Sequence, residues 1–406
     1  MYIKRTLEKA LKEASSAFKV VLLTGPRQVG KTTLLEHIEQ ETRSYISLDD
    51  LNYRIAAEQD PASFLERLQL PVLIDEVQYA PLLFPYIKML VDKLKKPGLV
   101  WLTGSQQFDM MKNVSESLAG RVAVLKLQGI SLAEEYGRIN EPPFLPDIKT
   151  LQARQKAAKV LSSLEVYHKI WRGSYPDVVL NDGQHWERFY ESYVTTYIQR
   201  DVRDYLKIND AASFHKFMQI AAARTGQLIN YRDIASDVGV SEPTIKSWLT
   251  VLHASGIIYL LPPYFNNHAK RLIKTPKLYF MDTGLCCFLT GWLTSNVLEK
   301  GAMAGAMLET YAISEIIKSY LNQGKTPRLY FYRDKDKREV DLLIEESGVL
   351  YPVEIKKTSA IKNISSHSFD KLNNLKTPIG HGGLLCFVNT LLPISKEMDA
   401  IPISYI

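Results

Sequence analysis

The residues from Gly25 to Thr32, GPRQVGKT, have the types and spacing of a loop that binds phosphate groups. Glycines at both ends of the loop permit a tight turn in which backbone N–H groups surround an anion. Lys31 can reach the β- and γ-phosphates of a nucleotide, and the Thr32 hydroxyl can ligate Mg²⁺. The pattern predicts an ATP and Mg²⁺ site made by Gly25, Pro26, Arg27, Gln28, Val29, Gly30, Lys31 and Thr32.

Two acidic residues, Asp75 and Glu76, follow an apolar run in the segment PVLIDEVQ. A strand that is apolar throughout is buried, and carboxylates at its C-terminal end lie beside a phosphate loop on the same sheet. We therefore expect Asp75 to help hold Mg²⁺ and Glu76 to orient and deprotonate the attacking water. The competing interpretation is that the two acids only begin a loop.

Three further residues are candidates for contact with the nucleotide. Ser105 and Gln106 end the apolar run LVWLTGSQQF, where a polar side chain can lie near the γ-phosphate and respond to hydrolysis. Arg121 precedes the run VAVLKL and can stabilise the charge that develops on the phosphate, in its own chain or in a neighbouring subunit. A polar strand end and a surface arginine are the competing interpretations.

A second group of acids lies near the C-terminus. Asp341 is in REVDLLIEE, and Glu354 and Lys356 are in YPVEIKKT. Alternate residues of a strand share a face, so Glu354 and Lys356 project together, and Asp341 on an adjacent strand can join them. These residues, with Glu309 on a preceding helix, predict a second Mg²⁺ or Mn²⁺ site in which Lys356 positions a water for phosphodiester attack. The alternatives are ordinary acids at strand ends, or a nuclease scaffold without activity.

The elements that position these residues follow from the apolar runs. The runs VVLLTG, RSYISLD, PVLIDE, LVWLTGS and RVAVLKL alternate with helical periodicity, which predicts an α/β fold with a buried parallel sheet. Three prolines in NEPPFLPD, residues 140–147, interrupt both helix and sheet and mark a boundary. We expect an N-terminal domain over residues 1–140, a helical region over 150–290 and a second α/β domain over 300–406.

The middle of the chain contains the signals of a helix-turn-helix. A short helix ends at Gly239, Ser241 is a suitable N-cap for the next helix, and the run IIYLL follows as a strand, which together outline a winged helix. The second helix has only Lys246 as a base, but HAKRLIKTPK, His268 to Lys277, supplies five basic residues for phosphate contacts. DNA binding and packing against the N-terminal domain are the two open interpretations.

Composition excludes several classes of protein. The chain has 406 residues, 46% of them hydrophobic, and a net charge of +6, which permits contact with nucleic acid but does not require it. The longest apolar runs are too short to span a bilayer, and the N-terminus lacks the features of a secretory signal. Cys286, Cys287 and Cys386 form neither a disulfide framework nor a zinc site, so we expect a cytoplasmic protein without a membrane partner.

The chain as a whole resembles a prokaryotic family of AAA-superfamily ATPases. The resemblance is carried by TGPRQVGKTTLL, LIDEVQ, LTGSQQF, SLAGRV, RGSYP, YIQRDV, KTPKLYFMDTGL and REVDLLI with VEIKKT. Proteins of this family have a C-terminal domain of unknown function that contains a winged helix and a restriction-endonuclease-like core. The resemblance implies ATP binding, hydrolysis and action on DNA. It extends the phosphate loop from Gly25 to Thr33 and places Ser105 at the sensor position. It also places Asp341, Glu354 and Lys356 at nuclease-like positions, although valine precedes the acid in EVDLL where a proline-aspartate pair is usual.

Three functional hypotheses follow from these features. The first is an ATP-driven switch or motor that is coupled to DNA or to a protein partner, and it is compatible with an oligomer in which Arg121 acts between subunits. The second is an ATP-regulated DNA nuclease. The third is a DNA- or protein-binding regulator that binds ATP without turnover.

Overall fold

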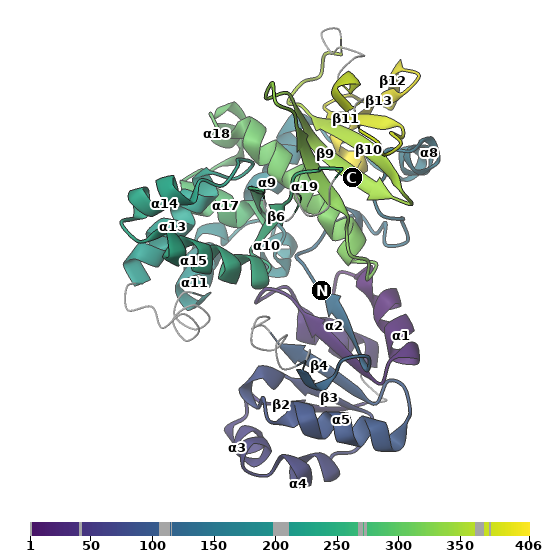
Figure 1. The fold of residues 1–406 in the computed structure, drawn as a ribbon, viewed down its shortest axis with the longest axis vertical. Coiled ribbons are helices and arrows are strands. Elements are labelled where there is room, and N and C mark those ends of the chain that lie inside the picture. Colours follow the sequence, from purple (N-terminus) through teal and green to yellow (C-terminus); the bar gives the residue numbers. More distant parts are fainter. Residues whose placement is uncertain are drawn as a thin grey trace.

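The computed structural model describes residues 2–39, 43–104, 114, 116–197, 211–266, 271, 274–361, 369–372 and 375–406. Figure 1 shows a purple and blue N-terminal part at the bottom, a teal helical part to one side, and a green and yellow sheet at the top. Each described helix is too short or too polar to cross a lipid bilayer.

The N-terminal part is built on a five-stranded sheet in the order β2-β3-β4-β1-β5, and every neighbouring pair is parallel. The predicted apolar runs are confirmed as its strands: β1 (Val20–Thr24), β2 (Ser44–Ser47), β3 (Val72–Asp75), β4 (Val100–Gly104) and β5 (Val122–Lys126). Alternate residues of β1 enter different clusters, Val21 and Leu23 in one and Val20 and Leu22 in the other. Both faces of the sheet are therefore buried, as the continuous apolar runs require.

Helices cover this sheet and connect its strands. Their bounds are α1 (Leu7–Ala17), α2 (Lys31–Glu39), α3 (Leu51–Gln59), α4 (Pro61–Glu66), η1 (Val77–Tyr79), α5 (Leu83–Leu94) and α7 (Leu132–Glu135). Leu7 and Leu11 of α1 pack in the cluster that holds Leu23, whereas Ile87 of α5 packs in the cluster that holds Leu22. The layers are helix, sheet, helix.

The middle of the chain is mainly helical. It contains α8 (Ile148–Ala157), α9 (Ser163–Arg172), α10 (Pro176–Leu180), α11 (Trp186–Tyr197), α13 (Ala211–Ala223), α14 (Tyr231–Val238), α15 (Glu242–Ala254), β6 (Ile258–Leu261), β7 (Lys277–Phe280) and α17 (Thr283–Thr290). The predicted helix boundaries are confirmed: Gly239 ends α14 with a left-handed backbone, and Ser241 caps α15 by accepting from the Thr244 N–H. Strands β6 and β7 pair in antiparallel fashion.

The C-terminal part is a six-stranded mixed sheet in the order β12-β13-β11-β10-β9-β8. Its elements are α18 (Ser295–Lys300), α19 (Ala304–Leu321), β8 (Leu329–Arg333), β9 (Glu339–Glu346), β10 (Val349–Ile355), η3 (Asp370–Leu372), β11 (Gly382–Cys386), β12 (Leu392–Ser395), β13 (Met398–Pro402) and η4 (Ile403–Tyr405). The helix and strands that were predicted to carry Glu309, Asp341 and Glu354 are confirmed as α19, β9 and β10, whereas the last two strands were not predicted. Together the three parts confirm the expected α/β fold class.

Candidate functional site

The phosphate loop joins the C-terminal end of β1 to the start of α2. Gly25 has φ +152° and Gly30 has φ +86°, and a Cβ atom on Gly25 would lie 2.1 Å from the Leu127 carbonyl oxygen. Only glycine fits this first position, because any side chain would collide with the backbone that follows β5. Gln28 and Thr33 are exposed, so the loop is open to solvent on one side.

Lys31 and Thr32 carry the polar groups that begin α2. Lys31 is buried, and its Nζ donates to the carbonyl oxygens of Gly25 (3.0 Å) and Pro26 (2.8 Å). The Thr32 Oγ1 donates to Asp75 Oδ2 at 3.0 Å. The structure thus brings together the loop, its lysine, its hydroxyl and the first acid of the LIDEVQ segment.

Two residues that the sequence analysis missed orient the Asp75 carboxylate. Buried Thr103, in β4, donates to Asp75 Oδ1 at 2.8 Å, and the Tyr45 hydroxyl of β2 donates to Oδ2 at 3.0 Å. Burial, followed by the neighbouring Asp75 carboxylate, raises the pKa of Tyr45. A threonine within an otherwise apolar strand was the available signal for Thr103.

These residues fit a nucleotide with Mg²⁺. Oxygen ligands suit Mg²⁺, and a hydroxyl and a carboxylate 3.0 Å apart at the mouth of a phosphate loop supply them. A buried lysine within the same loop supplies the cation that a phosphate chain requires. The candidate Mg²⁺ ligands are therefore Thr32 and Asp75.

Glu76 has a left-handed backbone, with φ +55°, which turns the chain sharply after β3. Its carboxylate accepts a hydrogen bond from Gln78, and its backbone N–H donates to Asp75 Oδ1 at 3.2 Å. Its predicted role with water stays a prediction. Ser105 and Gln106 lie outside the described residues.

Arg121 lies at the opposite edge of the sheet. The Val20 N–H, at the start of β1, donates to the Arg121 carbonyl at 3.1 Å. The phosphate loop follows the other end of β1, and the rise per residue of a strand separates the two ends by about 16 Å. The Arg121 Nε donates to both oxygens of Asp92, at 2.8 and 3.0 Å, and these bonds with one from Lys19 lower the pKa of Asp92. The prediction that Arg121 acts on the nucleotide of its own chain is therefore wrong. The prediction that it acts on the nucleotide of a neighbouring subunit stays a prediction.

Other parts of the chain support the phosphate loop. Buried Arg5 donates to the carbonyl oxygens of Val29 (3.1 Å) and Gln128 (2.7 Å). A Cβ atom on Gly256, in the turn between α15 and β6, would lie 3.2 Å from the Pro26 ring. The central helical part therefore packs directly on the first half of the phosphate loop.

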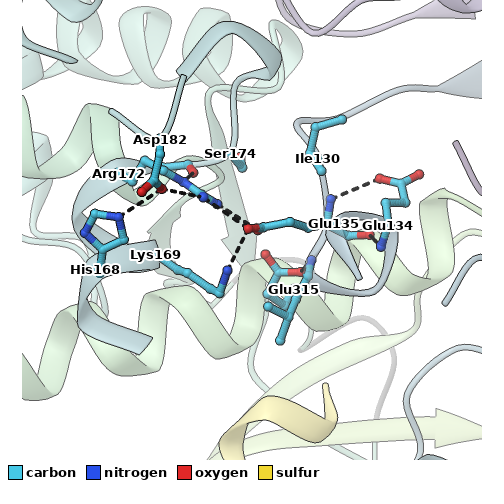
Figure 2. A network of polar contacts seen from close by, with 12 residues as sticks. Ile130, Glu134, Glu135, His168, Lys169, Arg172, Ser174, Asp182 and Glu315 are labelled. Atoms are coloured by element: carbon cyan, nitrogen blue, oxygen red, sulfur yellow. Dashed lines mark hydrogen bonds and ion pairs between the residues drawn. The ribbon is translucent and has the colours of Figure 1, made fainter. Parts of the chain in front are cut away.

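A polar joint connects the segment after β5 to α9 (Figure 2). The Glu135 carboxylate accepts from Arg172 at 2.7 and 3.1 Å and from Lys169 at 2.7 Å. Although burial acts in the opposite sense, the two cations lower the pKa of Glu135. Helix α19 joins the same segment, because its Glu315 accepts from the Leu132 N–H at 2.8 Å.

The joint explains two of the motifs that carried the family resemblance. In RGSYP, Arg172 makes the ion pair with Glu135, and the Ser174 N–H and hydroxyl donate to Asp282 Oδ2 at 2.7 and 2.8 Å. Asp282 is the acid of KLYFMDTGL, and its other oxygen accepts from the Tyr190 hydroxyl at 2.7 Å. The two motifs are therefore two halves of one packing site.

The C-terminal acids do converge as predicted. The Ile355 N–H donates to Asp341 Oδ2 at 2.8 Å, and Lys356 Nζ lies 3.4 Å from that oxygen and 3.1 Å from Glu354 Oε2. Burial, reinforced by Asp341, raises the pKa of Glu354 to about 7 and also raises the pKa of Glu309. Glu309 accepts from the Tyr279 hydroxyl at 2.6 Å.

Two further lysines pair with these acids. Lys371 Nζ lies 3.2 Å from Glu354 Oε1, and buried Lys277 lies 3.5 Å from Glu309 and 3.3 Å from Glu339. In the described part of the chain, no set of three or more His, Cys, Asp or Glu side chains is arranged to hold a metal ion. The predicted second Mg²⁺ or Mn²⁺ site thus gains no support.

Two of the five basic residues between His268 and Lys277 are buried and paired within the protein, and Lys274 is exposed. Arg271 is buried, stacks 4.0 Å from the Tyr264 ring centre and pairs with Glu345 at 3.3 Å. Lys277 is the buried lysine beside Glu309. The predicted phosphate contacts are wrong for these two residues, whereas His268 and Lys270 lie outside the described residues.

Comparison with known families divides the chain into three parts. Residues 17–136 match the model of an AAA domain, residues 164–296 match a domain of unknown function (DUF8612), and residues 304–406 match another (DUF4143). Two uncharacterized proteins, Rv2008c of Mycobacterium tuberculosis and Mb2031c of Mycobacterium bovis, are each 30% identical over 364 residues. Each match covers 88% of this chain and 74% of the relative.

Solved structures resemble the chain more distantly. The Walker-type ATPase PABY2304 of Pyrococcus abyssi has 15% identity and a TM-score of 0.44 over 71% of this chain and 96% of that protein. The Holliday junction branch migration motor RuvB of Thermotoga maritima has 18% identity and a TM-score of 0.31 over 63% of this chain and 89% of its own.

Proposed function

Because the chain belongs to the same family as these two mycobacterial proteins and carries an AAA domain, we propose that it is a Mg²⁺-dependent ATPase that acts as a switch. The observation that carries this proposal is the 3.0 Å approach of the Thr32 hydroxyl to the Asp75 carboxylate at the mouth of the phosphate loop. A hydroxyl and an acid in this arrangement are what an ATP-bound Mg²⁺ requires.

Each residue of the site contacts a different part of the nucleotide and its Mg²⁺. Backbone N–H groups between Gly25 and Gly30 surround the phosphates, and Lys31 exchanges its two carbonyl acceptors for phosphate oxygens. Thr32 and Asp75 hold Mg²⁺, which when bound neutralises charge on the β- and γ-phosphate oxygens. Glu76 orients the attacking water and accepts its proton.

The switch acts through the contact of the phosphate loop with the central helices. Pro26 packs against Gly256, and a movement of the loop on nucleotide binding displaces the turn between α15 and β6. That turn leads into the winged-helix-like unit of α13 to α15, β6 and β7, so we assign this unit the role of output element. The coupled partner is DNA or a protein.

The test compares Lys31→Ala with Lys19→Ala, a lysine at the far edge of the same sheet that pairs with Asp92. We expect Lys31→Ala to weaken ATP binding by roughly 10- to 100-fold, the effect of losing charged hydrogen bonds, and Lys19→Ala to leave it unchanged. Calorimetric titration with MgATP measures binding, and phosphate release with and without DNA measures turnover. Normal ATP binding by Lys31→Ala refutes the proposal, and tight binding without turnover favours the non-hydrolysing regulator.

A nuclease is the weaker candidate. Its supporting observation is the convergence of Asp341, Glu354 and Lys356. Against it, Lys356 and Lys371 lie 3.1 and 3.2 Å from the two oxygens of Glu354, and among the described residues no set of three or more His, Cys, Asp or Glu side chains is arranged to hold a metal ion. We therefore assign this cluster a structural role, as a charge-paired joint of the C-terminal sheet.

A further inference from the structure

The free edge of the N-terminal sheet forms one wall of a large cavity. Strand β5 ends the strand order, so one of its sides has no neighbouring strand among the described residues. Beside it lies a cavity of about 640 Å³, whose other walls come from α15 and β6, with His253 and Ile258, and from the end of α19, with Ile317 and Leu321. This volume is within the usual range for sites that enclose a ligand.

The backbone of β5 presents unpaired groups to this cavity. The Leu127 N–H donates to the Thr24 carbonyl at 2.8 Å, and the Arg121 carbonyl accepts from the Val20 N–H. The backbone groups of the odd-numbered residues from 121 to 127 therefore bond to β1. Successive residues of a strand direct their N–H and C=O groups to opposite sides. Those of Val124 and Lys126 therefore point away from β1, both residues line the cavity, and within the described ranges no backbone group bonds to them.

The charged residues that line the cavity are basic. Lys126 and Lys325 are exposed at its wall, His253 adds an imidazole, and none of the described lining residues is acidic. Apolar side chains, among them Met281, form most of the remaining wall. An exposed edge strand beside an apolar and cationic wall is a template for an extended peptide with acidic side chains.

We propose that this cavity binds an extended segment of a partner protein as a sixth strand on β5. The segment alternates acidic side chains, which meet Lys126 and Lys325, with apolar ones, which meet the partly exposed side chains of Tyr259 and Leu321. The backbone groups of Val124 and Lys126 pair with the added strand. None of the predicted ATP-binding residues from Gly25 to Thr33 lines this cavity, so peptide binding is tested without nucleotide.

The experiment uses the full-length chain and a fluorescein-labelled, capped hexapeptide that alternates valine and glutamate. Fluorescence anisotropy should show saturable binding with a Kd below about 1 mM. Val124→Pro removes an outward N–H while the bonds of the odd-numbered residues to β1 are kept, so we expect binding to weaken roughly two- to tenfold. Val122→Pro is the matched control, because Val122 lies on the same edge but outside the cavity.

Charge reversal and hydrogen exchange supply independent readouts. Lys126→Glu should lose affinity for the glutamate peptide and gain affinity for a matched peptide that alternates valine and lysine. In the unmodified chain, the glutamate peptide should slow amide exchange at Val124 and Lys126. Absence of binding at millimolar peptide, equal effects of the two proline variants, or unchanged exchange at β5 overturns the proposal.

Discussion

At the scale of single residues, the hydrogen bonds around Asp75 are the feature that most closely determines the chemistry. Its carboxylate accepts from the hydroxyls of Thr32, Tyr45 and Thr103, which come from α2, β2 and β4. The Glu76 N–H donates to it as well, and because a carboxylate has about four lone-pair sites, all of these donors can bond to it at once and fix its orientation. Asp75 is thus held in one orientation by the protein itself.

Thr103→Val tests this orientation. The substitution keeps the shape of the side chain but removes the buried donor to Asp75 Oδ1, so we expect phosphate release to slow by about tenfold while ATP affinity changes little. The control is Thr24→Val, because Thr24 is equally buried in β1 but donates to the Leu125 carbonyl. Equal rates in the two variants would show that Thr103 does not act through Asp75.

The local part of this site could be predicted from the sequence, and the part that depends on several strands could not. Lys31, Thr32 and Asp75 were found because spacing along the chain and the end of an apolar run locate them. Thr103 and Tyr45 depend on which strands become neighbours, which no local pattern contains. The error for Arg121 was avoidable, because a residue that precedes a parallel strand lies at the edge opposite to loops that follow such strands.

At the scale of elements, the turn between α15 and β6 is the part of the central region that packs on the phosphate loop. Gly256 has φ +73°, and a Cβ atom there would lie 3.1 Å from Gln128 Nε2 and 3.2 Å from the Pro26 ring. Both distances are shorter than ordinary van der Waals contact. The turn and the loop are therefore packed so closely that no side chain fits between them without displacing a neighbour.

Gly256→Ala should displace the Pro26 ring and so disturb the ATP site. Its matched control is Gly239→Ala, since Gly239 has φ +90° in the same region, but a Cβ atom there would have no described atom within 4 Å. Both variants should lose about 1–2 kcal/mol of stability from the left-handed backbone. Only Gly256→Ala should also weaken ATP binding, by roughly three- to tenfold, because Pro26 must shift. Calorimetric ATP titration and thermal melting of both variants separate the two effects, and equal ATP affinities would contradict the coupling.

The sequence also located most elements but not the full C-terminal sheet. Strands β1, β3 and β4 were evident because strands buried on both faces are apolar without interruption, whereas the edge strands β2 and β5 are only partly buried. Strands β12 and β13 were missed since LPIS and MDAIP are short and each contains a proline. The order of the six strands depends on long-range pairing, which short apolar runs do not specify.

At the scale of the whole molecule, the ion pairs of Glu135 join the AAA domain to the helices beyond it. Glu135 belongs to α7, which directly follows the sheet, and its partners Lys169 and Arg172 lie on α9. Breaking one partner of a buried ion pair leaves a charge that is neither solvated nor neutralised. The joint therefore makes the unfolding of one part depend on the other.

Glu135→Gln should separate the unfolding of the two parts. We expect a loss on the order of 3 kcal/mol, because Lys169 and Arg172 have little exposure and lose the charge of Glu135, their partly buried partner. In scanning calorimetry, the wild-type transition should shift as a whole with MgATP, whereas the variant should show two transitions of which only one responds to the nucleotide. Asp182→Asn is the control: Asp182 contacts the same Arg172 at 3.3 Å, but its side chain is 72% exposed, and the loss should be less than about 1 kcal/mol.

The same pair predicts a dependence on pH. The folded-state pKa of Glu135 is below its ordinary value of 4.5, because Arg172 and Lys169 outweigh the effect of burial. As the pH falls, Glu135 therefore binds a proton in the unfolded chain before it does so in the folded chain. The stabilisation by Glu135 is complete well above pH 4.5, and it is lost as the pH drops through the folded-state pKa. The difference in melting temperature between wild type and Glu135→Gln should accordingly be constant near neutral pH and shrink below 4.5. A difference that instead stayed the same in acid would mean that packing, and not charge, holds the AAA domain to α9.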